Sequence, residues 1–293
     1  HLIMNEMWQK ALIENGYSKT PKTLMFLFGN KPYIDVVTSF KFLIPSQISE
    51  PVKKKLLNFY LRKLRKNPEL HDKIEFEIVH SCYTPNFDEK ADELSKNGFN
   101  NDEIDEIKQK AFILTNNIIK NYKEYVANAK NDAQLLKERR AKTLISNMSE
   151  ASKIKSLLDD CRSLGTFHFS RIARFAFIGK AILSDMVKKD IANKEFYDKF
   201  LTCLKSPAMD LKFDSELISQ NKMDIDSFLD KYGHLRPGTY DITSPRYSTY
   251  PKIFFEKTPL RETIESPEDW SVPEETINKV DAFLENDGFE FDA

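Results

Sequence analysis

Glycine and cysteine are scarce in this chain of 293 residues, and each shortage excludes a class of structure. Eight glycines are too few for a turn-rich β architecture and favour helix over sheet. The three cysteines, Cys82, Cys161 and Cys203, are odd in number, far apart and without metal-ligand spacing. This pattern indicates a reducing compartment without a disulfide framework. We therefore expect all three to act as small apolar residues.

The chain also lacks an excess of charge of either sign. Its 44 basic and 45 acidic residues give a net charge of −1, so no global field favours nucleic acid or an anionic membrane, and we expect neither as a partner. No apolar run reaches the length of a membrane span, and the first residues lack the features of a signal peptide. We expect a cytoplasmic location. Because the sequence begins without Met, we also expect it to be one part of a longer enzyme.

Sequence motifs for nucleotide or metal binding are missing as well. The sequence contains no glycine-rich phosphate loop, no dinucleotide-binding fingerprint, no His-Glu-x-x-His and no Cys-x-x-Cys. An autonomous nucleotide or metal enzyme is therefore poorly supported, and we expect no metal ligands in this chain.

Helical periodicity dominates what is present. Asn100 and Glu103 form a capping pattern, and the helical signal that follows continues toward Asp160. Its apolar positions recur at steps of mostly three and four: Ile104, Ile107, Ala111, Leu114, Ile118 and Tyr125. A second helix is predicted to begin at a cap on Thr166 and to run to about Met186. Further helices are predicted over 50–66, 193–205 and 224–232, the last ended by Gly233.

Two segments have a different character. Residues 32–40 and 73–80 are rich in β-branched and aromatic residues, and the second alternates apolar residues with Glu75 and Glu77. We expect them to pair. The predicted fold is therefore mainly α, a helical domain with a small β-sheet.

The end of the sequence is acidic. Residues 261–293 hold eleven Asp and Glu residues against Arg261 and Lys279, a local net charge of −9. We expect a helix over about 273–284 within an acidic linker. The predicted organisation is a helical ligand-binding domain over 1–260, followed by a linker over 261–293.

The segment 232–247 crowds charged residues between turn formers. Its sequence is Tyr-Gly-His-Leu-Arg-Pro-Gly-Thr-Tyr-Asp-Ile-Thr-Ser-Pro-Arg-Tyr, which predicts a constrained loop of the kind that carries function. Arg236 and Arg246 could each hold a carboxylate or phosphate, His234 could transfer a proton near neutral pH, and Asp241 could hold an ammonium group. Alternatively, Arg236 and Asp241 form a structural ion pair and His234 caps a helix end.

The segment 165–174, Gly-Thr-Phe-His-Phe-Ser-Arg-Ile-Ala-Arg, is the second charged cluster. Arg171 and Arg174 are three residues apart and share a helix face near a predicted helix N-terminus, which favours anions. The alternative is that both arginines form ordinary salt bridges. His168, between two phenylalanines, is predicted to be structural, and so is Asp35.

Three blocks together resemble one family. Residues 32–40, 165–174 and 232–247 are similar to blocks of the central domain of phosphoenolpyruvate-synthase-like, ATP-dependent dikinases. Three blocks in the right order are more specific than any single motif. Within that family they are most similar to the branch that phosphorylates L-glutamine in the synthesis of capsular phosphoramidate. This chain has Val37 at a position where that family commonly carries an arginine.

The resemblance implies the role of the chain within a larger enzyme. An ATP-grasp domain absent from this sequence would bind ATP and Mg²⁺, and a swivelling domain, also absent, would carry a phosphohistidine. The mainly helical domain between them would bind the acceptor, L-glutamine. None of the five His residues here would then carry the phosphoryl group, and this fragment would be inactive alone.

The resemblance also implies residue roles. His234 and Arg236 would be catalytic, and the expected substrate-binding residues are Thr166, Arg174, Thr239, Asp241 and Arg246. Two alternatives stay open: the same architecture with another acceptor, such as pyruvate, an antibiotic or another small metabolite, or a helical interaction module without catalysis.

Overall fold

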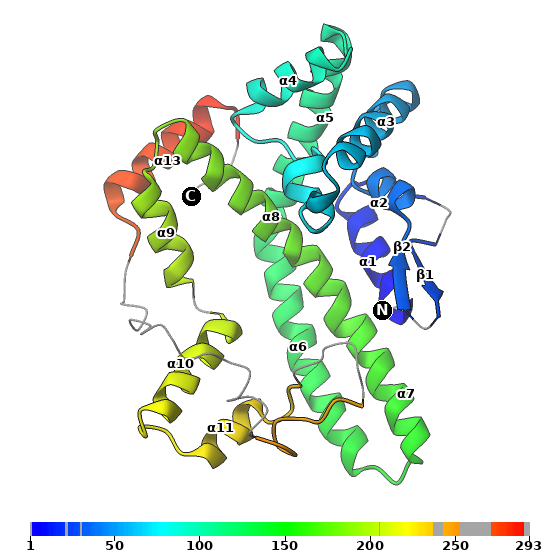
Figure 1. The fold of residues 1–293 in the computed structure, drawn as a ribbon, viewed down its shortest axis with the longest axis vertical. Coiled ribbons are helices and arrows are strands. Elements are labelled where there is room, and N and C mark those ends of the chain that lie inside the picture. Colours follow the sequence, from blue (N-terminus) through cyan, green and yellow to red (C-terminus); the bar gives the residue numbers. More distant parts are fainter. Residues whose placement is uncertain are drawn as a thin grey trace. The chain divides into compact units, whose positions relative to one another are not determined.

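A computed structural model describes residues 2–20, 23–29, 31–204, 206–236, 243–251 and 271–289. Helices dominate these residues, and one two-stranded antiparallel sheet accompanies them (Figure 1). The prediction of a mainly α fold with a small sheet is confirmed. The chain divides into two compact units, which we call unit 1 (residues 1–192 and 275–293) and unit 2 (residues 193–274). The functional boundary expected near residue 260 stays a prediction.

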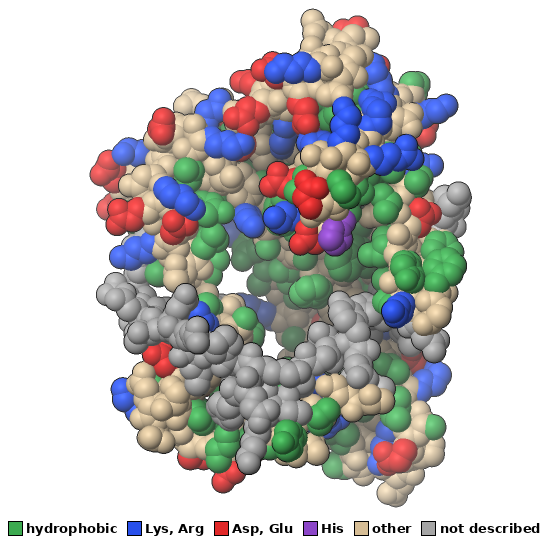
Figure 2. Space-filling view, in the orientation of Figure 1, with side chains coloured by type: hydrophobic (Ala, Val, Ile, Leu, Met, Phe, Trp, Pro, Cys, Tyr) green, Lys and Arg blue, Asp and Glu red, His purple; other side chains and the backbone are tan. Residues whose placement is uncertain are grey.

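Unit 1 begins with helix α1 (Leu2–Glu14) and a short hairpin, β1 (Met25–Phe28) and β2 (Lys31–Ile34). The hairpin register pairs Met25 with Ile34 and Phe28 with Lys31. Apolar side chains gather on the surface over this hairpin (Figure 2), where the exposed residues are Phe26, Leu27, Phe28, Tyr33 and Ile34. The hairpin therefore presents apolar surface on both strands.

The strand predicted over 32–40 ends early because Asp35 starts a helix. Its carboxylate accepts hydrogen bonds from the backbone N–H of Val37 (3.0 Å) and the hydroxyl of Thr38 (2.8 Å). These bonds cap helix α2 (Val36–Phe42), an arrangement that typically stabilises a helix by about 1 kcal/mol. The structural role predicted for Asp35 is confirmed. Helix α3 (Glu50–Lys66) follows, with Val52, Leu56, Phe59 and Tyr60 buried as predicted.

The strand predicted over 73–80 is wrong. After a 3₁₀ turn, η1 (Pro68–Asp72), residues Ile74–Ile78 form one π-helical turn, η2, closed by a 2.9 Å hydrogen bond from the backbone N–H of Val79 to the carbonyl of Ile74. The alternating pattern failed because Glu75 does not face solvent: its carboxylate contacts the buried Arg174. Strand β2 instead pairs with β1.

Long helices form the rest of unit 1, and α8 packs against both α1 and α6. Their bounds are α4 (Phe87–Lys96), α5 (Asn101–Lys120), α6 (Tyr122–Ile145), α7 (Glu150–Asp160) and α8 (Phe167–Lys188). The capping box at the start of α5 is confirmed: the side chain of Asn100 accepts from the backbone N–H of Glu103 at 2.9 Å, and the reciprocal bond measures 2.8 Å. The apolar positions predicted for this helix, from Ile104 to Ile118, are buried.

The predicted cap at Thr166 is wrong. A π-helical segment, η3 (Cys161–Thr166), joins α7 to α8 without a break, and Thr166 itself has helical backbone angles (φ −62°, ψ −36°). Its hydroxyl donates to the carbonyl of Cys161 at 3.3 Å. Gly165 lies inside this turn, so glycine here does not mark a helix end.

Unit 2 contains α9 (Lys194–Cys203), α10 (Pro207–Ser219) and α11 (Ile225–Tyr232). Gly233 ends α11, as predicted. A small core forms around Phe228 and Tyr232, and Leu211, Leu235 and Tyr247 pack against it.

Helix α13 (Glu274–Asn286) returns the chain to unit 1. After it, the ring of Phe289 lies 5.8 Å from that of Tyr83 and 5.2 Å from that of Phe112. None of the helices within the described ranges combines the length and apolar character needed to cross a membrane.

Candidate ligand-binding site

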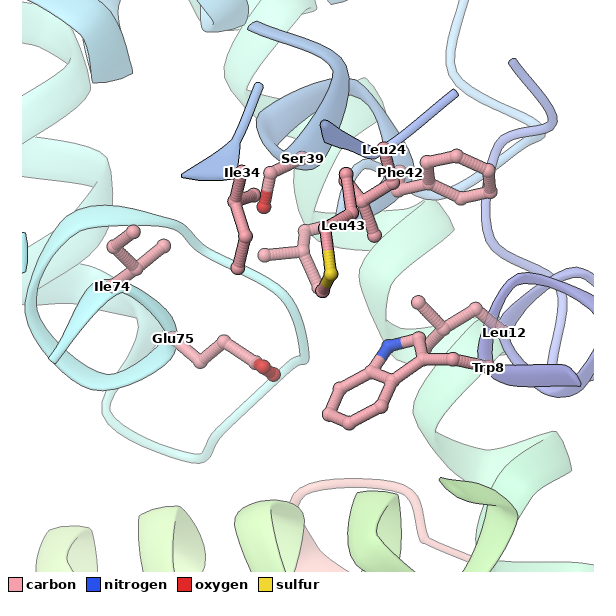
Figure 3. A pocket seen from close by; sticks show the side chains of 10 residues that line it. Trp8, Leu12, Leu24, Ile34, Ser39, Phe42, Leu43, Ile74 and Glu75 are labelled. Atoms are coloured by element: carbon pink, nitrogen blue, oxygen red, sulfur yellow. The ribbon is translucent and has the colours of Figure 1, made fainter. Parts of the chain in front are cut away.

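A cavity of about 350 Å³ lies in unit 1, where α1, the hairpin, α2 and η2 meet (Figure 3). Ile34 and Ser39, which line it, belong to the sequence block 32–40. Ten of the residues that the structure describes line it: Trp8, Leu12, Leu24, Met25, Ile34, Ser39, Phe42, Leu43, Ile74 and Glu75. Eight of these ten side chains are apolar, so the cavity suits a ligand with an apolar portion.

Glu75 brings negative charge to this cavity. Its carboxylate points inward from η2 (Figure 3) and contacts Nη1 of Arg174. Arg174 is only 1% exposed, and its guanidinium carbon lies 4.4 Å from the centroid of the Phe177 ring. Burial alone would lower the pKa of Arg174, but the Glu75 carboxylate and Tyr17 outweigh it, and that pKa lies above its ordinary value. Arg174 therefore acts on the cavity through Glu75.

Arg171 has a different environment from Arg174, although both lie on α8. Its guanidinium stacks on the ring of Tyr125, 3.5 Å from the centroid, and lies 5.2 Å from that of Phe167. Its Nη1 is 3.7 Å from a carboxylate oxygen of Glu14. Because α8 does not begin at a free helix end, the anion site expected at a helix N-terminus is not formed there. Arg171 joins α8 to α6 and α1, as the salt-bridge interpretation predicted.

His168 has the structural role that was predicted. It is 7% exposed, and its Nε2 lies 2.7 Å from a carboxylate oxygen of Asp132. This contact ties α8 to α6. Thr166, two residues earlier, is half-buried, and its hydroxyl donates to the carbonyl of Cys161. Its predicted contact with a substrate stays a prediction.

The loop after α11 in unit 2 folds back on itself. The backbone N–H of Tyr247 donates to the carbonyl of Leu235, and that of Ser248 donates to the carbonyl of Gly233, both at 3.0 Å. A Cβ atom on Gly233 would lie 2.3 Å from the carbonyl oxygen of Leu229 and 2.9 Å from Cβ of Ser248. Glycine is required here because two backbone segments approach closely.

The basic residues of this loop are accessible. His234 and Arg246 are exposed and Arg236 is half-buried, so all three lie within reach of a ligand. Thr239 and Asp241, the other two residues predicted in this block, lie outside the described residues. The predicted convergence of residues 165–174 with residues 232–247 stays a prediction, since the two blocks belong to different units.

Asp214, which binds the end of α11 just before this loop, was not among the residues predicted from the sequence. Asp214 on α10 accepts hydrogen bonds from the hydroxyl of Tyr232 and from Nζ of Lys231, both at 2.7 Å. Burial would raise the pKa of Asp214, but these two donors lower it below its ordinary value. Helix α10 also carries Asp210, Lys212 and Glu216, so the sequence holds no signal that singles out Asp214.

Among the described residues, no group of three or more His, Cys, Asp or Glu side chains is arranged to hold a metal ion. Comparisons with protein-family models, curated proteins and solved structures found no match.

Proposed function

We propose that this chain is the acceptor-binding domain of a cytoplasmic, ATP-dependent dikinase with L-glutamine as its acceptor. One observation supports this proposal most. The blocks 32–40 and 165–174, both of which carry the family resemblance, meet around one cavity: Ile34 and Ser39 line it, and Arg174 holds the lining residue Glu75. Residues that are far apart in the sequence thus serve a single concave site, as a ligand-binding function requires.

The proposed reaction converts ATP, L-glutamine and water into AMP, phosphate and L-glutamine phosphate. ATP and Mg²⁺ would be bound by a separate ATP-grasp domain, and the phosphoryl group would reach the acceptor from a phosphohistidine on a separate swivelling domain. The present chain would bind and orient the acceptor. Phosphoryl transfer depends largely on such positioning and on electrostatic stabilisation.

Three basic residues of unit 2, of which His234 and Arg246 are exposed and Arg236 is half-buried, have the chemistry to bind the acceptor. Arg236 and Arg246 would hold the acceptor carboxylate or the oxygens of the incoming phosphoryl group. His234 would orient the amide nitrogen of the acceptor or accept its proton. Thr239 and Asp241, with Thr166 of unit 1, complete the proposed substrate-binding set. Arg174 would contribute by positioning Glu75.

A second acceptor class is favoured by the cavity itself. Because eight of the ten lining side chains are apolar, an acceptor with an apolar body, such as an antibiotic, would bury more surface there than L-glutamine. A helical interaction module without a small-molecule site is the third hypothesis, and it predicts that no acceptor binds.

Isothermal titration calorimetry separates these hypotheses. We expect saturable binding of L-glutamine at millimolar concentration, weakened at least about tenfold by Arg236→Ala, a loss of about 1.4 kcal/mol. Arg139→Ala, which removes an exposed arginine of α6, is the matched control and should leave binding unchanged. Binding of an apolar acceptor without L-glutamine binding would select the second acceptor class. Absence of binding to every acceptor, L-glutamine and pyruvate included, would contradict the proposal.

A further inference from the structure

The described lining of the cavity in unit 1 combines apolar side chains with one acidic residue. Among the ten described lining residues, Glu75 alone is charged, Ser39 contributes a hydroxyl and none is cationic. In a cavity of this kind the apolar walls provide most of the contact area, and the few polar groups fix the orientation of the ligand. The orientation here would be set by a negative charge.

The Glu75 carboxylate has an ionic partner, Arg174, outside the described lining of the cavity. Arg174 contacts it, is almost fully buried and carries a guanidinium that stays protonated at physiological pH. One guanidinium contact leaves acceptor capacity on a carboxylate, which has about four lone-pair sites. Since the carboxylate points into the cavity (Figure 3), that remaining capacity is offered to a ligand.

Trp8 lies across the cavity from Glu75 (Figure 3). The face of an indole ring attracts a cation through its quadrupole, and tryptophan is the strongest of the aromatic side chains in this respect. A carboxylate on one side and an indole on the other suit an ammonium group, which can donate to the first and contact the second. A carboxylate or phosphate at the same place would face Glu75, and the ten described lining residues offer it no cationic partner.

We infer that this cavity binds a primary ammonium group attached to an apolar or aliphatic body, with the ammonium at Glu75. The inference rests on the proposed function in taking the cavity as the acceptor site. It assigns the amino group of the acceptor to Glu75 of unit 1, in place of Asp241. The apolar part of the ligand would lie against Leu43 and the hairpin residues Met25 and Ile34.

A fluorescence titration tests the charge requirement directly. The chain has two tryptophans, so Trp270→Phe leaves Trp8 as the reporter. We expect 2-phenylethylammonium to bind at least about tenfold more tightly than 2-phenylethanol, which has the same body without the charge. Glu75→Gln should abolish this difference. Glu77→Gln, an exposed residue of the same turn, should preserve it.

Two further measurements separate a binding effect from a folding effect. Glu75→Gln leaves Arg174 without its ionic partner, so circular dichroism must show that the variant is folded at the titration temperature. Ser39→Leu places bulk in the cavity without touching the ion pair and should weaken both ligands together. Equal affinity for amine and alcohol in the parent protein, or binding that survives Ser39→Leu unchanged, would overturn the inference.

L-Glutamine in the same titration distinguishes the two proposals. If L-glutamine does not bind while the amine is still preferred over the alcohol, the acceptor identity fails and the ammonium site stands. If L-glutamine binds while amine and alcohol are equal, the acceptor identity stands and the role of Glu75 is refuted.

Discussion

His80 is a buried titratable residue within an aromatic cluster. It is 7% exposed, and its ring stacks on Tyr60 at a centroid distance of 5.9 Å. Its Nε2 lies 3.2 Å from one carboxylate oxygen of Glu93, and Nζ of Lys63 lies 2.7 Å from the other. Burial lowers the pKa of His80 to about 4 despite the hydrogen bond with Glu93, and that bond, with Lys63, lowers the pKa of Glu93 to about 2.

This environment predicts a loss of stability in mild acid. The unfolded chain protonates His80 near pH 6.5, whereas the folded protein resists protonation until about pH 4. The folded state therefore binds fewer protons between these values, and the free energy of unfolding falls as pH is lowered through this window, by up to about 3 kcal/mol. Urea unfolding at pH 7.0, 5.5 and 4.5 measures the loss.

His80→Gln keeps an amide donor for Glu93 and cannot titrate, so its stability should vary much less with pH across this window. His71→Gln replaces an exposed histidine and should retain the pH dependence of the parent. Parallel pH profiles for His80→Gln and the parent would show that another group is responsible.

The buried ion pair between Arg174 and Glu75 leads to a second prediction about stability at the residue scale. Arg174→Met removes one partner of a buried ion pair and leaves Glu75 beside apolar groups, which should destabilise unit 1 by about 3 kcal/mol. The double variant Arg174→Met with Glu75→Met should be more stable than the single variant, because no uncompensated charge remains. Arg139→Met, from an exposed pair with Asp160, should cost less than about 1 kcal/mol. Denaturation by guanidinium chloride measures the free energy of unfolding of each variant. Equal losses of that free energy in the single and the double variant would contradict the prediction.

At the scale of elements, the junction between α11 and its loop depends on Gly233. Because Gly233 has no Cβ atom, the carbonyl oxygen of Leu229 and Cβ of Ser248 can lie close to it. Gly233→Ala should therefore force the backbone apart and destabilise unit 2 by roughly 1–3 kcal/mol. Gly179→Ala is the matched control, because a Cβ atom there meets no heavy atom within 4 Å, and alanine in a helix should stabilise α8 by up to about 1 kcal/mol. Similar losses for both variants would rule out the close contact as the cause.

Elements fixed by local sequence patterns were predictable, whereas an element fixed by a long-range contact was not. Helix α5 was predictable because its capping box and apolar spacing are local, and the end of α11 was predictable from Gly233. The strand expected over 73–80 was not formed, because Glu75 turns inward toward Arg174, a partner about a hundred residues away. Arg174 was a candidate because of its charge near a predicted helix start, whereas Glu75, the residue that lines the cavity, was expected on the polar face of a strand.

At the scale of the whole molecule, unit 2 is an insertion within unit 1. The chain leaves unit 1 after residue 192 and returns at residue 275, and Phe289 then packs on Tyr83 and Phe112. Among the described residues, unit 2 has the smaller core, built around Phe228 and Tyr232. A smaller unit buries a smaller fraction of its surface, so unit 2 should be the less stable of the two.

Differential scanning calorimetry should therefore resolve two transitions, with unit 2 unfolding at the lower temperature. Gly233→Ala should lower only the first Tm, and Arg174→Met only the second. A given loss of free energy should move the first transition further, because about 1 kcal/mol shifts Tm by about 4–8 °C in a domain of 60–100 residues and by about 2–4 °C in one of 150–250 residues. If either variant moves both transitions together, the two units unfold as one cooperative block, and a ligand bound in the cavity of unit 1 would then also stabilise the loop of unit 2.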